Sequence, residues 1–279
     1  MQRFMAPAKI NLCLHLLGRR SNGYHDLCML MQKVSLYDEV WIEMRSNAGV
    51  SVECDGVRLK DGEVNIARRA AEALLSRVPG TAPGVGIRIV KHIPVAAGLG
   101  GGSSDAATVL KALNELLGLN LDQKELACLA LKIGADVPFF LGPSPAWAEG
   151  VGEVLTPLKH EMPECCFALV NPGIALSTAQ VYRMVRHYTP CPAKEEHISN
   201  LEELVAILHN DLESPALQLA PEVEQVKKSL LENGARDALM TGSGSTVFGV
   251  FDTHADADRV AQRLERNFGW WTCVVSGVS

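Results

Sequence analysis

The sequence predicts a two-domain protein in which β-strands and helices are mixed. Its 279 residues exceed the usual size of one domain, about 100–150 residues, but are too few for three domains of that size. A hydrophobic fraction of 47% with 21% charged residues is typical of a globular chain that can form sizeable cores. Glycine, proline and polar residues gather at 150–163. We therefore expect an N-terminal domain at 1–155 and a C-terminal domain at 156–279.

The N-terminal segment predicts paired β-strands. Residues 7–17 alternate polar and apolar side chains, which places Lys9 and Asn11 on the face opposite the isoleucine and leucines. Residues 18–26 are typical of a loop, and 27–36 form a second strand-like run. An antiparallel pair is the expected arrangement.

A strand, a glycine-rich loop and a helix follow one another in the middle of the chain. Asn65 is a good N-cap for a first helix, which we expect to end near Leu75. Alternating apolar residues at 85–89 predict a strand, and apolar spacing at 104–117 predicts a helix capped by Ser103 or Ser104.

A further helix at 122–133 leads to Asp136, which the following Pro138 makes a turn residue or a helix start. The C-terminal part of the chain alternates strands and helices. We expect strands at 167–170, 246–251 and 271–275, and helices at 178–188, 200–209 and 222–232.

Charge and cysteine content restrict the function. A formal net charge of −6 argues against a broad nucleic-acid surface, which requires clustered lysine and arginine. The eight cysteines show no spacing typical of a zinc site, so we expect free buried thiols. With no leader-like start and no long apolar run, the cytoplasm is the expected compartment, with no membrane partner.

The glycine-rich loop predicts a phosphate site. Glycines without Cβ atoms allow backbone N–H groups to approach an oxyanion, and the start of a helix adds a partial positive charge. A flexible turn is the alternative, but it does not require four glycines followed by Ser-Ser-Asp. The expected ATP-binding residues of this loop are Pro94, Val95, Ala96, Ala97, Gly98, Leu99, Gly100, Gly101, Gly102, Ser103 and Ser104.

Two other nucleotide-binding motifs do not fit this loop. The GxxxxGK[ST] pattern of P-loop proteins is absent, and a GxGxxG pattern beginning at Gly98 would place Ser103 at its last glycine. Ser103 and Ser104 can bond phosphate, approach Mg²⁺, or simply cap the helix.

Six motifs together resemble a known superfamily of small-molecule kinases. These are PAKINL at 7–12, NGYHDL at 22–27, PVAAGLGGGSSDAA at 94–107, GADVPFFL at 134–141, EGVGE at 149–153 and TGSGST at 241–246. In this order they are similar to the superfamily of galactokinase, homoserine kinase, mevalonate kinase and phosphomevalonate kinase. The resemblance covers nearly the whole chain.

The resemblance implies a two-domain α+β fold, with an N-terminal nucleotide-binding domain, a C-terminal substrate domain and an active site in the cleft between them. PAKINL, GYH and ADVPFF resemble the member that phosphorylates the 2-hydroxyl of a cytidine-diphosphate-linked methylerythritol, in non-mevalonate isoprenoid precursor biosynthesis. The resemblance implies ATP and Mg²⁺. Ser104 is the expected metal ligand, and the protein is expected to be a monomer or homodimer.

The resemblance also assigns roles to individual residues. Asp136 would orient or deprotonate the substrate hydroxyl, and Lys9 would stabilise the charge on the transferring phosphoryl group. The alternatives are a turn cap for Asp136 and a surface salt bridge for Lys9. Asn65 and Lys91 would line the nucleotide pocket. The expected substrate-binding residues are Asn11, Tyr24, His25, Thr178 and Tyr182, with His25 at the base edge.

For Tyr182 a place in a helical core is the alternative. The TGSGST segment is expected to pack against the phosphate loop or touch the substrate, and a structural turn is its alternative. Two rival functions remain: another kinase of the superfamily, mevalonate-type or homoserine, and a nucleotide-binding regulator without catalysis. A substrate without a nucleobase would have no use for Tyr24 and His25, and a regulator would have no use for both Lys9 and Asp136.

Overall fold

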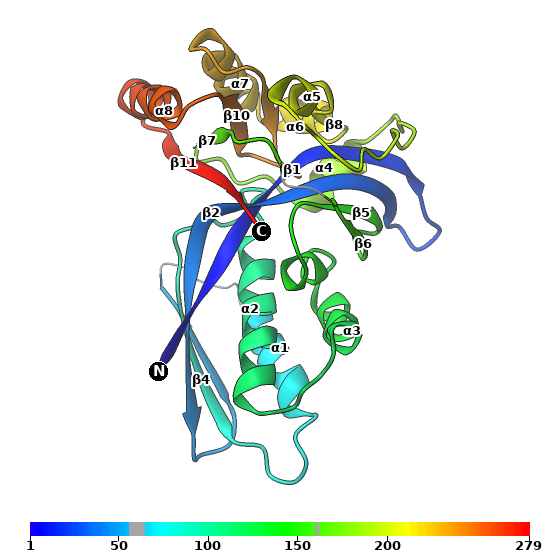
Figure 1. The fold of residues 1–279 in the computed structure, drawn as a ribbon, viewed down its shortest axis with the longest axis vertical. Helices are drawn as coiled ribbons and strands as arrows, with labels where there is room; N and C mark the ends of the chain where they lie inside the picture. The colour runs from blue at the N-terminus through cyan, green and yellow to red at the C-terminus, as the bar shows by residue number, and fades with distance from the viewer. Residues whose placement is uncertain (56–64, 160–161) are drawn as a thin grey trace. The chain divides into compact units, whose positions relative to one another are not determined.

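The computed structural model describes residues 1–55, 65–159 and 162–279 (Figure 1). The predicted boundary region therefore contains two residues, 160 and 161, that lie outside the described part. Contacts divide the chain into two compact units, each made of several segments. Unit 1 comprises Met1–Ala8, Leu36–Pro94 and Gly100–Pro143, and unit 2 comprises Lys9–Ser35, Val95–Leu99 and Ser144–Ser279. The first two strands contribute to both units, so the single division after residue 155 stays a prediction.

Unit 1 contains a sheet in the order β3-β4-β2. Strand β4 (Gly84–Val90) pairs antiparallel with β2 (His25–Arg45) and parallel with β3 (Val50–Cys54). The first strand, β1 (Gln2–Arg19), also pairs with β2. The alternation seen in the sequence therefore predicted β1, β2 and β4, but it did not predict β3.

The helices that the structure describes in unit 1 pack against one another, and in Figure 1 the first two of them lie beside the sheet. Helix α1 (Ile66–Leu75) begins after Asn65, whose side chain accepts from Ala67 N at 2.9 Å. Helix α3 (Gln123–Ile133) begins with a capping box between Asp122 and Glu125. The 3-10 turn η1 (Pro138–Leu141) follows Asp136, which lies in a turn as predicted.

Helix α2 (Gly101–Leu116) begins three residues before its predicted start. Its N-cap is Gly100 in a left-handed conformation, so the prediction that Ser103 or Ser104 caps the helix is wrong. Both serines belong to the first turn, because the glycines continue into the helix instead of ending before it.

Unit 2 contains a sheet in which β11 lies between β2 and β7, followed by β10 and β9. The pairs within β11-β7-β10-β9 are antiparallel. A second group joins β5 and β6 to the first half of β2, and β8 pairs parallel with β1. The bounds are β5 (Ala146–Gly150), β6 (Val154–Pro157), β7 (Cys166–Asn171), β8 (His209–Asn210), β9 (Ala238–Met240), β10 (Val247–Phe251) and β11 (Trp271–Val278).

The structure describes five helices in unit 2. They are α4 (Thr178–Met184), α5 (Leu201–Ala206), α6 (Glu213–Leu219), α7 (Glu222–Glu232) and α8 (His254–Phe268). Helix α8 packs on β11, β7 and β10, and α7 packs on β10 and β9. Helices α6 and α8 were not predicted from the sequence, and neither were strands β5, β6, β8 and β9. Strand β6 falls within the region 150–163 that was assigned to a boundary. Helix α4 ends at Met184, four residues before the predicted end.

The middle of β1 is buried on both faces. Ile10 and Leu12 are fully buried, yet Lys9 and Asn11 on the opposite face are 4% and 2% exposed. The polar face of this strand therefore does not face solvent, and its polar groups require partners inside the protein.

The cysteines correct one prediction. Cys28 on β2 and Cys191 form a disulfide across 163 residues of sequence, so the expectation of free thiols is wrong for this pair. The spacing of the cysteines in the sequence did not predict this disulfide, because only the fold brings the two residues together. The other six cysteines, all within the described part of the chain, are free as expected, but only Cys13 and Cys166 are buried and Cys128 is exposed. Among the described residues, no helix is both long and apolar enough to cross a membrane.

Candidate active site

The phosphate loop has the backbone that its glycines predict. Gly98 and Gly100 have φ angles of 79° and 71°, in the left-handed region that favours glycine. Ala96 also has a positive φ of 54°, which is uncommon for a residue with a side chain. The loop then enters α2 at Gly101, so Gly101, Gly102 and Ser103 carry the N–H groups at the helix start, which have no acceptor within a helix. The N–H of Ser104 already donates to the Gly100 carbonyl oxygen at 2.9 Å.

Lys9, Asn11, Gly98 and Thr241 form a compact cluster within unit 2, which we call the Lys9 cluster. Lys9 Nζ donates to Asn11 Oδ1 at 2.5 Å and to the Gly98 carbonyl oxygen at 2.7 Å. Asn11 N in turn donates to Thr241 Oγ1 at 2.9 Å. The ammonium group is therefore fixed beside the backbone of the glycine-rich loop.

The TGSGST segment lies against the loop residues of the same unit. Thr246 N donates to the Ala97 carbonyl oxygen at 3.3 Å, and Thr241 Oγ1 lies 3.4 Å from the Gly98 carbonyl oxygen. A Cβ atom at Gly98 would clash with the Thr241 carbonyl oxygen, and one at Gly242 would lie 3.2 Å from Lys9 Nζ. Glycine is therefore required at both positions, because the TGSGST segment lies so close to the loop and to Lys9.

Lys91, Asp38 and Asp105 form a buried ion network within unit 1. Lys91 Nζ pairs with Asp38 Oδ2 and, at 2.8 Å, with Asp105 Oδ2. The other oxygen of Asp38 accepts from the backbone N–H groups of His92 and Ile93 at 2.6 and 2.8 Å. The carboxylate of Asp38 thus fixes the end of β4 where the chain turns toward the phosphate loop.

The charges in this network shift two pKa values upward. Burial raises the pKa of Asp105 to about 7, and although Lys91 opposes the rise, Asp38 adds to it. Burial acts to lower the pKa of Lys91, but Asp105 and Asp38 outweigh it and hold that pKa above its usual value. The lysine therefore stays protonated, and Asp105 is the member of the network that titrates near neutral pH.

Helix α2 carries, near its start, two polar atoms without hydrogen-bond partners among the described residues. Ser104 Oγ and Asp105 Oδ1 are both buried, and neither has a partner in the described part of the chain. Buried polar oxygens are rarely left unsatisfied, and a ligand or ion is one common reason. Ser103, by contrast, is only half-buried.

The remaining predicted residues of unit 1 lie at element ends. Asn65 caps α1 through its side-chain oxygen, which is therefore already used within the protein. Asp136 is half-buried in the turn before η1. The role of Asn65 at the nucleotide and the pairing of Asp136 with Lys9 both stay predictions.

His25 lies at the start of β2, where two tyrosines contact its ring. The His25 and Tyr182 ring centroids are 5.1 Å apart, and the His25 and Tyr188 centroids are 6.1 Å apart. We call these three residues the His25 cluster. Tyr24, one residue before His25, is 61% exposed, so its ring surface is available for stacking.

The protonation state of His25 suits hydrogen bonding to a base. Its burial, with a smaller contribution from the charge of Arg19, lowers its pKa, so the imidazole is neutral at pH 7. A neutral imidazole has one donor and one acceptor nitrogen. Thr178, also predicted for substrate binding, shares a hydrogen bond of 2.8 Å with Ser243 of the TGSGST segment.

A second histidine group also lies in unit 2. One ligand atom each of His15, His209 and Asp211 lies within 4.8 Å of the others, a grouping that sequence spacing did not indicate. The imidazoles are stacked with centroids 4.3 Å apart, and their nitrogens are hydrogen-bonded to Thr189 and Asp211. Two nearly parallel stacked rings do not direct their in-plane lone pairs at one ion, so the group is a hydrogen-bond network.

Sequence reasoning missed several residues that the structure adds. Asp38 was overlooked, although an acidic residue between the apolar Leu36 and Val40 of a strand-like run is a usable signal. Tyr188 lay inside a region predicted as helix, and nothing in its local sequence indicated a contact with His25.

Comparison with known proteins agrees with this geometry. The family described as "GHMP kinases N terminal domain" matches residues 65–142, and "GHMP kinases C terminal" matches residues 193–269. A 4-diphosphocytidyl-2-C-methyl-D-erythritol kinase from Syntrophotalea carbinolica is 47% identical over 100% of both chains.

Two solved structures extend the comparison. A 4-(cytidine 5'-diphospho)-2C-methyl-D-erythritol kinase aligns with a TM-score of 0.81 and 38% identity, over 99% of this chain and 100% of the other. A homoserine kinase from Cytophaga hutchinsonii aligns with a TM-score of 0.74 and 20% identity, over 99% of this chain and 94% of the other, a likeness of fold alone.

The fold and the glycine loop thus define a GHMP kinase, as the motifs predicted, with the expected α+β architecture. Sequence identity of 47% and 38% to two kinases of one named activity, over 99–100% of this chain, then identifies the family within the GHMP kinases. The chain belongs to the family of 4-diphosphocytidyl-2-C-methyl-D-erythritol kinases.

Proposed function

We propose that this protein transfers the γ-phosphoryl group of ATP to the 2-hydroxyl of 4-diphosphocytidyl-2-C-methyl-D-erythritol, a step of non-mevalonate isoprenoid precursor biosynthesis. The observation that carries the proposal is 47% identity to a kinase of that name over the full length of both chains. The Lys9 and His25 clusters support it, because they offer a fixed cation and a base-reading imidazole.

Lys9 and Asp136 are the proposed catalytic residues. An alcohol is a poor nucleophile at neutral pH, and phosphoryl transfer depends on positioning and on charge stabilisation. Asp136 would accept the proton of the hydroxyl as its oxygen bonds to phosphorus and the bond to the departing ADP breaks. Lys9, held by Asn11 Oδ1 and the Gly98 carbonyl oxygen, would stabilise the negative charge that shifts between these oxygens.

Nucleotide and substrate contacts divide between two sets of residues. The loop 94–104, with Asn65 and Lys91, would hold ATP. Asn11 would bond the substrate near the transferred position, and Thr178 would join it from α4. His25 would pair with the edge of the cytosine ring, while Tyr24 and Tyr182 would stack on its faces, at about 1–3 kcal/mol per stacked base.

Mg²⁺ is part of the proposal. The unpartnered Ser104 Oγ fits a hard cation that prefers oxygen ligands and is held largely by substrate phosphates. When bound, the ion would neutralise charge on the phosphates. Ser104→Ala should raise the Mg²⁺ concentration needed for half-maximal activity several-fold, while Ser103→Ala should raise it less; equal effects would remove Ser104 as the ligand. We place the enzyme in the cytoplasm, as a monomer or homodimer.

Phosphate transfer from Mg²⁺-ATP tests the substrate directly. The cytidine substrate should be assayed beside mevalonate and homoserine, with the product position assigned by phosphorus NMR. Transfer to the cytidine substrate alone, at the 2-hydroxyl, is the expected result. Transfer to another alcohol would keep the kinase and replace its substrate, and no transfer with intact ATP binding would favour a regulator.

A further inference from the structure

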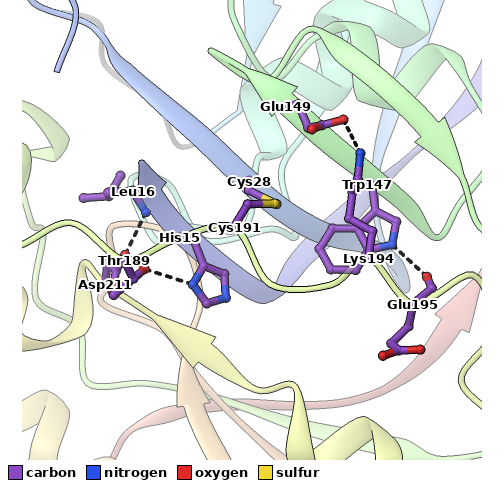
Figure 2. Close-up of a disulfide and its surroundings, with 10 residues drawn as sticks. All are labelled: His15, Leu16, Cys28, Trp147, Glu149, Thr189, Cys191, Lys194, Glu195 and Asp211. Carbon is purple, nitrogen blue, oxygen red and sulfur yellow. Dashed lines mark hydrogen bonds and ion pairs between the residues drawn. A yellow bond between two sulfur atoms is a disulfide. The ribbon is translucent and has the colours of Figure 1, made fainter. Parts of the chain in front are cut away.

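Residues 185–198 follow α4 without forming a helix or strand, and we call this segment the strap. It is fastened to the rest of unit 2 at several places (Figure 2). Near its start, Thr189 N donates to the Leu16 carbonyl oxygen at 3.0 Å, and Thr189 Oγ1 donates to Asp211 Oδ2 at 2.6 Å. His15 Nδ1 lies 2.9 Å from the same hydroxyl.

The middle and the end of the strap carry further attachments. Cys191 is joined to Cys28 by the disulfide, with Cα atoms 5.7 Å apart. Lys194 forms an ion pair of 2.8 Å with Glu149, and Trp147 Nε1 donates to a backbone oxygen of the strap at 2.9 Å. Exposed ion pairs of this kind contribute about 0–1 kcal/mol, so the disulfide and the Thr189 bonds are the stronger attachments.

These attachments fix the position of Tyr188. It directly precedes Thr189 in sequence, and its ring contacts His25 at 6.1 Å between centroids. Each contacting aromatic residue is followed three positions later by one of the disulfide cysteines: Cys28 follows His25, and Cys191 follows Tyr188. The covalent link therefore ties together the two short segments that carry the contacting rings.

The orientation of the His25 ring decides what it can recognise. The second side-chain torsion of histidine is broad and roughly two-fold, so packing must select the ring orientation. Tyr182 contacts the ring from a regular helix, whereas Tyr188 contacts it from an irregular segment. A residue in an irregular segment keeps one position only when other bonds offset the conformational entropy of the segment.

We propose that Tyr188 is a positioning residue for His25, and that the strap, fastened by Thr189 and the Cys28–Cys191 disulfide, holds it in place. The proposal deepens the function proposed above and rests on it: Tyr188 keeps the imidazole in the orientation that recognises a cytosine edge. The cytoplasm proposed above is a reducing compartment, and the disulfide form is the state in which the strap is held more tightly. A dithiol that reduces the disulfide is itself oxidised to a disulfide and leaves two cysteine thiols, which loosens this contact.

Substitution of Tyr188 tests the positioning role through a KM-against-kcat comparison. Tyr188→Ala should raise the KM for the cytidine substrate about tenfold, leaving kcat and the KM for ATP within twofold. Tyr188→Phe keeps the ring and should restore the wild-type KM. Equal KM values for the wild type and Tyr188→Ala, or a parallel fall in kcat with all substrates, would overturn the proposal. Circular dichroism and thermal unfolding confirm that each variant is folded.

Reduction tests the role of the strap. Cys191→Ser, or reduction of the wild type, should raise the same KM about threefold, and the reductant should leave the Cys191→Ser variant unchanged. Lys194→Ala removes only an exposed ion pair and is the matched control, with a change below twofold. An unchanged KM after complete reduction, verified by thiol titration, would show that the disulfide does not hold Tyr188.

Failure of the proposed function can be separated from failure of this inference. Calorimetric binding of CDP requires no phosphoryl transfer. If the wild type does not phosphorylate the methylerythritol substrate but binds CDP, and Tyr188→Ala weakens that binding while Tyr188→Phe does not, the positioning role stands and the function must be replaced. CDP binding that is equal in all three proteins overturns the positioning role.

Discussion

The Lys9 cluster and the His25 cluster belong to the same unit but are built in different ways. In the Lys9 cluster, side chains on β1 and the TGSGST segment bond one another and the loop backbone, and Lys9 and Thr241 are 4% and 0% exposed. In the His25 cluster, a buried imidazole is surrounded by rings of which Tyr188 is 45% exposed.

This difference has a consequence for function. Groups fixed by the backbone of a buried core are suited to stabilising charge in a transition state, because they need no reorganisation during the reaction. Exposed rings on irregular segments are suited to capturing a ligand. Changes in the Lys9 cluster should therefore lower kcat, and changes in the His25 cluster should raise KM.

The largest expected effect is the loss of the Lys9 charge. Lys9→Met keeps most of the side-chain volume but removes the ammonium group, so kcat should fall on the order of 10³-fold. ATP binding, measured by calorimetry, should change far less. Asp136→Asn should have a similar effect.

Residues that act as one unit are not additive, so the double variant Lys9→Met/Asp136→Asn should be little worse than either single variant. Multiplicative losses in steady-state assays would show that the two residues contribute independently. If the Lys9→Met variant had the kcat of the wild type, the proposal that the Lys9 cluster stabilises charge in the reaction would be wrong.

The glycine of the Lys9 cluster should be the next most sensitive position. Gly98→Ala introduces a Cβ at a φ of 79° and against the Thr241 carbonyl oxygen, so it should cost about 2 kcal/mol of folding free energy or more. Thermal unfolding measures this loss.

Gly102→Ala is the matched control for stability. Its Cβ would meet Ile66 at an ordinary 3.5 Å within a helix, where alanine is favoured over glycine. This variant should be as stable as the wild type or more so. Equal destabilisation by the two substitutions would contradict the close approach between the loop and the TGSGST segment.

The His25 cluster should show its own pH dependence. Because the pKa of His25 is lowered, the neutral imidazole persists below pH 6.5, and cytidine binding should weaken only as pH falls through that lowered value. The KM for the cytidine substrate, measured from pH 8 to pH 5, should rise at the acid end while that for ATP does not. His25→Gln should raise this KM at neutral pH about tenfold and remove the rise at acid pH. A rise that persists in His25→Gln would assign it to another group.

The smallest expected effect concerns Asp105, outside both clusters. Its pKa is about 7 in the folded protein, above that of an ordinary carboxyl, so its contribution to stability is fully present at low pH and is lost as pH rises toward and through 7. Asp105→Asn should remove this dependence. Between pH 5 and pH 8, the Tm of the wild type should therefore fall by a few degrees relative to the Tm of the variant. A constant difference would contradict the raised pKa.

Local patterns predicted much of the fold. The strands at the N-terminus, the helices after Asn65 and Asp122, and the turn at Asp136 follow from alternation, capping residues and proline, which act over a few neighbours. Helix α8 was missed although its signals were present, with Thr253 as N-cap and Gly269 at its end. The miss at α2 has a different cause, because the three consecutive glycines at 100–102 gave no reason to extend a helix into them.

The sequence by itself determined the phosphate loop, the kinase superfamily and the identity of the main candidate residues, since glycine conformation and helix capping are local properties. Only the tertiary structure decided the partners. It placed Lys9 beside Gly98 and Asn11 beside Thr241, joined Lys91 to two carboxylates, and connected Cys28 to Cys191. These contacts link residues up to about 230 positions apart, and such pairings depend on the packing of the whole unit, which no local pattern records.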